Sequence, residues 1–463
     1  MNFETRDTIV ALSTAHGSGA IALVRLSGPR ALAIAGDVFY NSRSEKISLS
    51  EKANKAVFGI IKHKDEILDE VVVTVFKGPR SYTGDDVVEI SCHGSLYIQQ
   101  QLIQLLLSEG ARAAQPGEFT MRAFLNGRLD LSQAEAVADL IASNSAVSHQ
   151  VAVKQMRGGF SAKISRLRES LLDFASLIEL ELDFSEEDVE FADRGELLDL
   201  VSRILAVIAQ LVTSFELGNV IKNGVPVAIV GKPNAGKSTL LNVLLDDDRA
   251  IVSEIPGTTR DVIEDELVIG GVLFRLIDTA GLRTTEDVIE QIGVNKAYEV
   301  MKRSAIVIYL FDAHEFSAAD VRGELNALKK VIGNSELLPV ANKIDQNDEE
   351  ALREEFSDFE NVLFISAREK LHINSLKMRL LERFDQKAAG VGETVVTNAR
   401  HAQALKNAHS ALEKVKQGLA TGISGDLLAL EIRFALNELG NITGQVTSEE
   451  LLGNIFSRFC IGK

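Results

Sequence analysis

The sequence has 463 residues, 46% of them apolar and 25% charged, which excludes a disordered chain and suggests about three folded domains. The formal net charge of −17 excludes a surface that binds nucleic acid over its whole extent, although it leaves a local basic patch open. Two cysteines are too few for a disulfide framework. No stretch approaches the roughly 20 apolar residues of a membrane span, and the first residues carry no basic-then-apolar signal segment. We therefore expect a cytoplasmic protein without a membrane contact.

The first part of the chain mixes strand and helix patterns. Short β-branched runs broken by glycine predict strands at residues 8–13, 20–28 and 70–78. Residues 95–111 have apolar positions at helical spacing and end beside Gly110, so they predict a helix. We therefore expect an α+β domain here.

Strand signals stop near residue 129. Residues 131–156 and 163–182 have the periodicity of long amphipathic helices, and the acidic run at 179–191 reads as a solvated connection between helices. Helical patterns return at 401–420 and 425–442. These segments predict one helical domain built from two separate parts of the chain.

Between these two parts, short apolar strands alternate with helices. The strand candidates are residues 225–231, 273–281, 305–312, 337–343 and 361–367. Such a rhythm predicts a mostly parallel sheet, inserted into the helical domain at a surface loop. The predicted domains are 1–126 (N-terminal), 127–218 (first helical part), 219–385 (inserted) and 386–463 (second helical part).

The stretch "GKPNAGKST", Gly231 to Thr239, fits the phosphate-binding pattern G-x-x-x-x-G-K-[ST]. It follows a predicted strand and opens a predicted helix, which is the context that the pattern requires. Gly231 and Gly236 let backbone N–H groups turn toward phosphate oxygens, Lys237 neutralises the β- and γ-phosphates, and the Ser238 hydroxyl ligates Mg²⁺.

Three further motifs follow in the order of a guanine-nucleotide-binding domain. "DTAG" begins at Asp278, which is placed to hold the Mg²⁺ shell, and "GTTRD" before it supplies Thr258 or Thr259 as a second Mg²⁺ ligand. The Asp345 carboxylate of "NKID" can accept two hydrogen bonds from guanine, which adenine cannot provide. The expected GTP contacts are Asn234, Ala235, Gly236, Lys237, Ser238, Thr239, Ser253, Glu254, Ile255, Pro256, Gly257, Thr258, Thr259, Asp278, Thr279, Ala280, Gly281, Asn342, Lys343, Asp345, Ser366, Ala367 and Arg368.

Hydrolysis needs a group that positions water, and the usual place for it is unsuitable here. Leu282 follows the "DTAG" glycine, where Ras-like proteins carry a glutamine. The residues alone leave the role open to Glu286, Asp287 or Glu290, and Arg260 and Arg283 are candidate arginine fingers that fit an ordinary surface role better. The Asn234 side chain either ligates a monovalent cation near the phosphates or only tolerates a tight turn.

The whole chain resembles one family, the tRNA-modification GTPase MnmE (TrmE) family. Besides the nucleotide motifs, the resemblance rests on "DTIVALSTAHGSGAIALVRLSG", "YTGDDVVEISCHG", "QPGEFTMRAFLNGRLDLSQAEAVADLI" and "FCIGK". The implied fold is a multidomain α/β and α protein: an N-terminal α+β folate-binding-like domain that dimerises, a central helical domain and an inserted Ras-like P-loop GTPase domain. "SEELLGNIFSRFC" carries apolar residues at helical spacing, so we expect the last helix to dock.

The resemblance also implies a reaction and its partners. The family forms a homodimer and works with the flavoprotein MnmG (GidA-like), which carries the FAD, in a heterotetramer or larger complex. The pair adds a carboxymethylaminomethyl or aminomethyl group at C5 of the wobble uridine of certain tRNAs, with a one-carbon unit from 5-formyl- or methylene-tetrahydrofolate. K⁺-dependent dimerisation of the GTPase domains activates GTP hydrolysis.

Residue by residue, the resemblance implies the following roles. The folate contacts are Arg25, Glu89, Arg128 and Lys463, and the reactive cysteine is Cys460, either as a nucleophile or as a structural thiol. The water-positioning acid is Glu290. The metal ligands are Ser238 and Thr259 for Mg²⁺, and Asn234, Ser253, Ile255 and Thr258 for K⁺.

A second function stays open at this point: a GTPase regulator or assembly factor whose N-terminal domain only dimerises. Folate binding separates the two hypotheses. Because the net charge of −17 disfavours tRNA binding by this chain alone, we expect the flavoprotein partner to supply much of the basic surface for tRNA.

Overall fold

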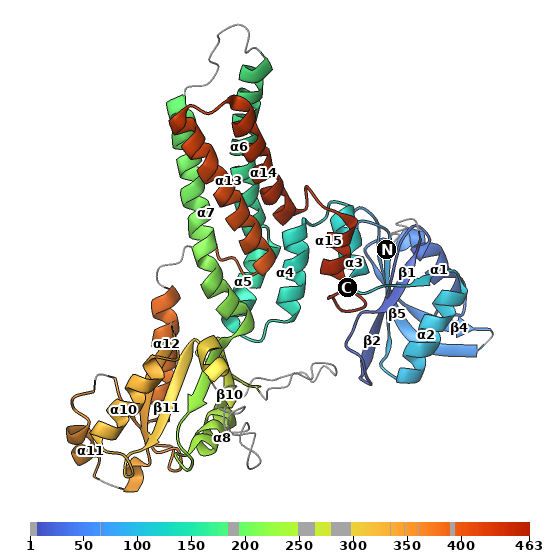
Figure 1. Ribbon diagram of the computed structural model, residues 1–463. Helices are drawn as coiled ribbons and strands as arrows, with labels where there is room; N and C mark the ends of the chain where they lie inside the picture. The colour runs from blue at the N-terminus through green and yellow to red at the C-terminus, as the bar shows by residue number, and fades with distance from the viewer. Residues whose placement is uncertain are drawn as a thin grey trace, which may run out of the picture. The chain divides into compact units, whose positions relative to one another are not determined.

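The computed structural model describes residues 7–64, 66–183, 194–248, 264–278, 298–333, 335–346, 348–359, 361–388 and 394–463 (Figure 1). The chain divides into two compact units, each assembled from separated segments. One unit holds residues 1–138, 154–193 and 421–463, and the other holds residues 139–153 and 194–420. The four-segment division expected from the sequence stays a prediction.

The first unit contains a seven-stranded sheet in the order β3-β4-β5-β6-β2-β1-β7. All neighbouring pairs are antiparallel except β1 and β7, which run parallel. The strands are β1 (Ile9–Leu12), β2 (Ile21–Ser27), β3 (Phe39–Asn41), β4 (Ala56–His63), β5 (Glu66–Phe76), β6 (Val87–His93) and β7 (Arg112–Ala113). The sequence prediction of β1, β2 and β5 is confirmed, and β3, β4, β6 and β7 had no prediction.

Helices α1 (Ala31–Val38) and α2 (Leu96–Ser108) bury their apolar faces on this sheet, because alternate strand residues and helix residues at 3–4 spacing form one core. Leu102, Leu105 and Leu106 of α2 belong to that core. The first unit also contains a 3₁₀ turn (Leu49–Lys52), α3 (Glu118–Leu125), most of α4 (Leu131–Ile141), α6 (Gly159–Asp183), α14 (Gly425–Thr443) and α15 (Glu449–Phe456), whereas most of α5 (Ala146–Met156) belongs to the second unit.

Residues 131–156 form two helices, α4 and α5, where the sequence predicted one long helix. The helix is interrupted at Ser143, Asn144 and Ser145, residues whose side chains compete with helical backbone bonds. The Ser145 hydroxyl accepts a hydrogen bond from the backbone N–H of Ser148 and so begins α5. Residues 184–191 of the acidic run lie outside the described residues.

Helix α15 docks as predicted. Leu452 and Phe456 are buried in a small core with Met121 of α3 and with Leu131 and Ala134 of α4. This packing brings the last residues of the chain to the N-terminal sheet, which matters for the site described below.

The second unit is a three-layer α/β/α fold around a six-stranded sheet in the order β13-β12-β11-β8-β10-β9. The strands are β8 (Val225–Val230), β9 (Glu264–Ile269), β10 (Val272–Asp278), β11 (Ile306–Asp312), β12 (Glu336–Asn342) and β13 (Leu363–Phe364). All pairs are parallel except β9 and β10. The predicted mostly parallel sheet is confirmed, and β9, which had no prediction, adds the antiparallel edge.

Helices cover both faces of this sheet. One core contains residues of α7 (Arg194–Asn223), α8 (Lys237–Asp248) and α12 (Ile373–Ala388), and the core of the opposite face contains residues of α10 (Ala318–Lys329). Helix α11 (Glu349–Glu355) also packs on that second face through Leu352. Helix α13 (Ala399–Thr421), most of α5 and a 3₁₀ turn (Ile344–Gln346) also belong to this unit.

One expectation about membranes needs correction. Of the described helices, α7 is long and apolar enough to cross a membrane by length and composition alone, over Gly195–Asn223. Its Val201, Ile204, Leu205 and Ile208 are nevertheless buried at helical spacing, as in the core helix of a folded domain. The segment is therefore weak evidence for a membrane span.

Candidate functional site

The phosphate-binding loop connects the carboxyl end of β8 to the start of α8. Asn234 and Gly236 both have left-handed backbone conformations, with φ of 65° and 96°. The Lys237 ammonium donates to the carbonyl oxygens of Gly231 and Lys232, each at 2.9 Å, so it lies across the loop. Ser238 and Thr239, in the first turn of α8, are exposed. The loop and the helix N-terminus therefore present N–H groups, an ammonium and hydroxyls to one place.

Asn342 ties this loop to the base-binding side of the site. Its Nδ2 donates to the Ala235 carbonyl at 2.8 Å, and its Oδ1 accepts from the Ala367 N–H at 2.9 Å. The Asn342 side chain is buried, as are Ala235 and Ala367. A side chain at Gly236 would collide with the Asn342 amide, so glycine is required there by space as well as by φ. One buried amide thus fixes the spacing of three loops.

Lys343 is held from two directions. Its ammonium lies 2.6 Å from the Asp312 carboxylate, and its backbone carbonyl accepts a hydrogen bond from the His314 ring at 3.0 Å. Burial alone would raise the pKa of Asp312, but the hydrogen bonds from Lys343 and from the His314 N–H outweigh it and lower that pKa. Asp312 therefore stays ionised and holds Lys343 in its left-handed backbone conformation, with φ of 67°.

Asp345 lies beside the loop after β13. One of its carboxylate oxygens accepts from the Ser366 hydroxyl at 2.5 Å, and that hydroxyl in turn accepts from the Glu369 N–H at 3.1 Å. Ser366 is buried, whereas Arg368 is exposed. The structure therefore brings together the predicted residues of "NKID" and "SAR" at the carboxyl ends of β12 and β13.

Asp278 is the last residue of β10 and lies opposite Ile229 of β8, next to the start of the phosphate-binding loop. The other predicted nucleotide, metal and catalytic residues of this domain lie outside the described residues. They are Ser253, Glu254, Ile255, Pro256, Gly257, Thr258, Thr259, Thr279, Ala280, Gly281 and Glu290.

A second cluster surrounds Arg25 of β2 in the N-terminal unit. Arg25 pairs with Glu89 of the neighbouring strand β6, with 2.8 Å between Nη2 and Oε1 and 2.9 Å from Nε to the same oxygen. The pair is directly opposite in the sheet register. The guanidinium also lies over the rings of Tyr82 and Phe119, at 5.5 and 5.7 Å from their centroids. These contacts fix a partly exposed cation on a sheet face.

The last residues of the chain form one wall of this cluster. The Gly462 carbonyl accepts from Arg25 at 3.3 Å and from the Ser13 hydroxyl at 3.1 Å, and the Cys460 carbonyl accepts from the Gly117 N–H at 3.3 Å. Burial lowers the pKa of Lys463, and the nearby Arg25 charge lowers it further. The structure therefore places the Lys463 side chain near Arg25, which is itself paired with Glu89.

The chain is similar to known proteins along nearly its whole length. The model of the GTP-binding protein TrmE N-terminus matches residues 8–128, and the model of the MnmE helical domain matches residues 131–460. Proteins named tRNA modification GTPase MnmE are 54% identical in Flavobacterium psychrophilum over 460 residues (99% of each chain), in Flavobacterium johnsoniae over 464 residues (99% of each chain) and in Cytophaga hutchinsonii over 457 residues (99% of this chain and 98% of that one).

The chain belongs to the MnmE family.

Arg128, to which the family resemblance assigns a folate contact, is less well placed than Arg25 or Lys463. It lies in the exposed turn after α3, and the contact described for it is the hydrogen bond from its backbone N–H to Ala123 at 2.8 Å. Its side chain is not part of the described Arg25, Glu89 and Lys463 cluster. A role for Arg128 in an MnmE folate site stays a prediction.

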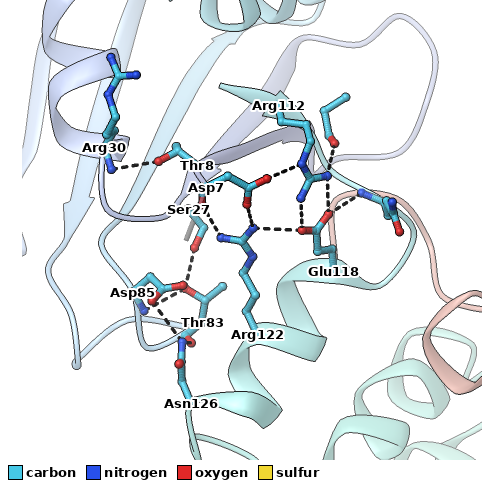
Figure 2. A network of polar contacts seen from close by, with 12 residues as sticks. Asp7, Thr8, Ser27, Arg30, Thr83, Asp85, Arg112, Glu118, Arg122 and Asn126 are labelled. Atoms are coloured by element: carbon cyan, nitrogen blue, oxygen red, sulfur yellow. Dashed lines mark hydrogen bonds and ion pairs between the residues drawn. The ribbon is translucent and has the colours of Figure 1, made fainter. Parts of the chain in front are cut away.

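A partly buried charge network around α3 had no prediction from the sequence (Figure 2). Arg122, only 1% exposed, donates to the Asp7 carboxylate at 2.5 Å and to Glu118 at 3.0 Å. Arg112 bridges the same two acids, at 2.5 Å to Asp7 and 2.6 Å to Glu118. The network joins α3 to Arg112 of β7 and to Asp7, two residues before β1. Phe119 of the same helix lies under Arg25.

The pKa values in this network favour its charged form. Burial would raise the pKa of Glu118, but the hydrogen bonds from Arg112, the Gln115 N–H and Arg122 outweigh it, and the pKa is lowered. Asp7 follows the same balance, with burial opposed by Arg112 and Arg122. The stretch "PGEFTMRAF" does contain a possible ion pair, because Glu118 and Arg122 are four residues apart on one helix. Such a pair usually lies on a solvent-exposed helix face, so the sequence does not predict that it is buried.

The two thiols differ in surroundings. Cys92 is buried in the core of the N-terminal sheet, and burial together with Asp69 raises its pKa to about 11. Cys460 is exposed beside Lys463. Only Cys460 is thus placed for chemistry with a bound molecule.

Proposed function

We propose that this MnmE-family chain binds and hydrolyses GTP, and that hydrolysis serves the addition of a carboxymethylaminomethyl or aminomethyl group at C5 of the wobble uridine of certain tRNAs. The observation that carries the nucleotide half of the proposal is the buried Asn342 amide. It joins the phosphate-binding loop to the loop that approaches Asp345. The tRNA half is supported by the names of relatives that match 99% of this chain.

The residues present fit a guanine nucleotide with Mg²⁺. The phosphate-binding loop supplies N–H groups, and Gly236 leaves no room for a side chain. Lys237 would contact the β- and γ-phosphates, while Ser238 and Thr259 would hold Mg²⁺, which neutralises charge that develops during phosphoryl transfer. Asp345, with one oxygen fixed by Ser366, would accept from the guanine edge.

Hydrolysis in this proposal depends on K⁺ and on an acid in place of the usual glutamine. Asn234, Ser253, Ile255 and Thr258 would hold K⁺ near the phosphates, where its positive charge substitutes for an arginine finger. Glu290 would position the attacking water. The left-handed Asn234 backbone supports the first assignment only in part, because a tight turn alone also needs it.

The Arg25 cluster fits the carboxylated tail or pterin of a tetrahydrofolate. The Arg25 charge lowers the pKa of the nearby Lys463, so an added carboxylate would offset the repulsion between the two cations. Glu89 and the tail carbonyls offer acceptors for the N–H groups of a pterin. When bound, the folate supplies the one-carbon unit; the protein groups hold and orient it, and Cys460 lies at the same wall.

The remaining partners follow from the same proposal. The chain would form a homodimer through its N-terminal region and assemble with the FAD-containing flavoprotein MnmG, in the cytoplasm. With a net charge of −17, this chain is a poor tRNA platform by itself, so the flavoprotein would supply much of the basic surface.

Calorimetry and hydrolysis assays test the two halves separately. Titration with 5-formyltetrahydrofolate should give binding heat for the wild type and none for Arg25→Ala, whereas GTP hydrolysis should be equal in both. Replacing K⁺ with Na⁺ should slow hydrolysis without changing folate binding, and Glu290→Ala should bind GTP but fail to hydrolyse it. Absence of heat in the wild type, with normal GTPase activity, would favour a GTPase regulator or assembly factor without one-carbon chemistry.

A further inference from the structure

One stretch of this acidic chain carries only positive charge. Residues 140–168 contain no aspartate or glutamate, although the whole chain has 66 acids in 463 residues. The same stretch contains five lysine and arginine residues, all of them after residue 153. Four of these residues form what we call the basic turn: Lys154, Arg157 and Arg166, which are exposed, and Lys163, which is half-buried.

The four cations gather around the connection between α5 and α6. Lys154 is in the last turn of α5 and Arg157 follows it, while Lys163 and Arg166 are three residues apart on α6. A Cβ at Gly159, the first residue of α6, would lie 3.3 Å from the Lys154 carbonyl oxygen, so the start of α6 lies against the end of α5. Arg166 is seven residues further on, about 10 Å along the axis of α6. All four residues belong to the same compact unit.

The charges of the basic turn are not balanced by the part of the chain that the structure describes. None of the four side chains makes an ion pair or a side-chain hydrogen bond with a described residue. Lys154 and Arg157 stand at the C-terminal end of α5, where the helix dipole favours cations. Lys163 and Arg166 have no such role, because α6 begins just before them and has no acid until Glu169. Cations held together without a counter-charge repel one another, so a bound polyanion would stabilise this arrangement.

The neighbouring side chains indicate which kind of anion fits. Among residues 142–168, no exposed position carries a large apolar side chain. A helix that binds a membrane surface would need apolar residues that insert among the lipids, and a protein interface would need aromatic or aliphatic anchors. Lysine and arginine without apolar anchors are typical of a surface that neutralises the phosphates of a nucleic acid.

We propose that the basic turn binds the sugar-phosphate backbone of the tRNA substrate. The proposal rests on the proposed function, from which it takes tRNA as the nucleic acid. Phosphate contacts orient a nucleic acid without reading its sequence, so this contact positions the tRNA and is compatible with several different tRNAs. It gives an acidic chain one direct contact with the substrate, while the flavoprotein partner supplies the rest of the basic surface.

RNA binding by the full chain tests the basic turn. The probe is a labelled, unmodified transcript of a tRNA with uridine at the wobble position, titrated between about 50 and 200 mM KCl. Arg157→Gln with Arg166→Gln should weaken binding on the order of tenfold at the lower salt concentration. The slope of log Kd against log salt should fall by about two, since each phosphate contact contributes roughly one. GTP hydrolysis should be unchanged, which shows that the variant is folded.

Two control pairs separate charge at this place from charge in general. Lys329→Gln with Lys330→Gln removes two exposed cations at the end of α10 and should leave the affinity and the salt slope unchanged. Arg157→Lys with Arg166→Lys keeps the positive charge and should retain the wild-type slope. Equal effects of the two glutamine pairs, an unchanged slope for the Arg157 and Arg166 glutamine pair, or an equal loss in the lysine pair would overturn the proposal.

Two further results would assign the basic turn to another partner and overturn the proposal. One is sedimentation with phosphatidylglycerol vesicles that is lost in the Arg157 and Arg166 glutamine pair while RNA binding stays normal. The other is loss of the complex with the purified flavoprotein in the same variant, again with normal RNA binding. RNA binding is measured without the modification reaction. Persistence of the modified uridine in a strain that lacks the gene would therefore refute the proposed function, whereas normal RNA binding by the glutamine pair would refute only the role of the basic turn.

Discussion

Asn342→Asp is a nearly isosteric change that tests whether one buried amide assembles the nucleotide site. The carboxylate can still accept from the Ala367 N–H, but the atom that donated to the Ala235 carbonyl becomes an acceptor facing an acceptor at 2.8 Å. The residue is only 2% exposed, so water cannot replace the lost donor. Leaving a buried carbonyl unpaired costs about 1–3 kcal/mol, and the repulsion adds to it.

A loss of about 3 kcal/mol corresponds to roughly 150-fold weaker binding, at 1.4 kcal/mol for each factor of ten. Titration of a fluorescent GDP analogue should show this loss for Asn342→Asp. Asn326→Asp on α10 makes the same chemical change at an exposed position and should bind as the wild type does. A dissociation constant for Asn342→Asp within about threefold of the wild type would refute the reasoning.

Three further outcomes follow from the N-terminal unit. Iodoacetamide at pH 7.5 should alkylate Cys460 and leave Cys92 unmodified, because the raised pKa of about 11 keeps the buried Cys92 thiol protonated. Mass spectrometry of the peptides measures the labelling, and rapid labelling of Cys92 would contradict the prediction. Folding lowers the pKa values of Asp7 and Glu118, so the stability that these two carboxylates contribute is present above their unfolded-state pKa values near 4 and is lost as the pH falls through the folded-state values. Glu118→Gln should therefore make thermal stability fall less steeply below pH 4.5. An unchanged pH profile of thermal stability would exclude Glu118 as a source of this dependence. Gly462 has φ of 95°, and a Cβ there would collide with the Leu12 backbone. Gly462→Ala should therefore displace the last residues and weaken folate binding at least tenfold, on the order of 1.4 kcal/mol, with GTP hydrolysis unchanged. Equal folate affinity of the variant and the wild type in calorimetry would show that the last residues do not contribute to the folate site.

The sequence was sufficient for those features that depend on local chemistry. The phosphate-binding loop could be placed between β8 and α8 because its glycines, lysine and serine have fixed positions around a phosphate. The parallel sheet followed from alternating apolar strands and helices, and docking of α15 followed from its apolar spacing. In each case the decisive residues are close together along the chain.

Contacts between distant residues could not be predicted in the same way. Asp7 and Arg122 are 115 positions apart, and nothing in either local sequence shows that the arginine is buried. Asn342 was expected at the nucleotide, but its bridge between Ala235 and Ala367 depends on the loops after β8, β12 and β13 lying side by side. Strand β9 was missed because its first three residues, Glu264 to Glu266, are all acidic, a composition that does not predict a strand, although the segment forms the edge of the sheet.

Nucleoside analysis of tRNA tests the central claim most directly. In a strain that lacks this gene, the C5-modified wobble uridine should disappear. The wild-type gene should restore it, whereas Arg25→Ala and Lys237→Ala, expressed at equal level, should not. Persistence of the modified uridine in the deletion strain would contradict the proposed function, and restoration by Arg25→Ala would contradict the role of the folate cluster.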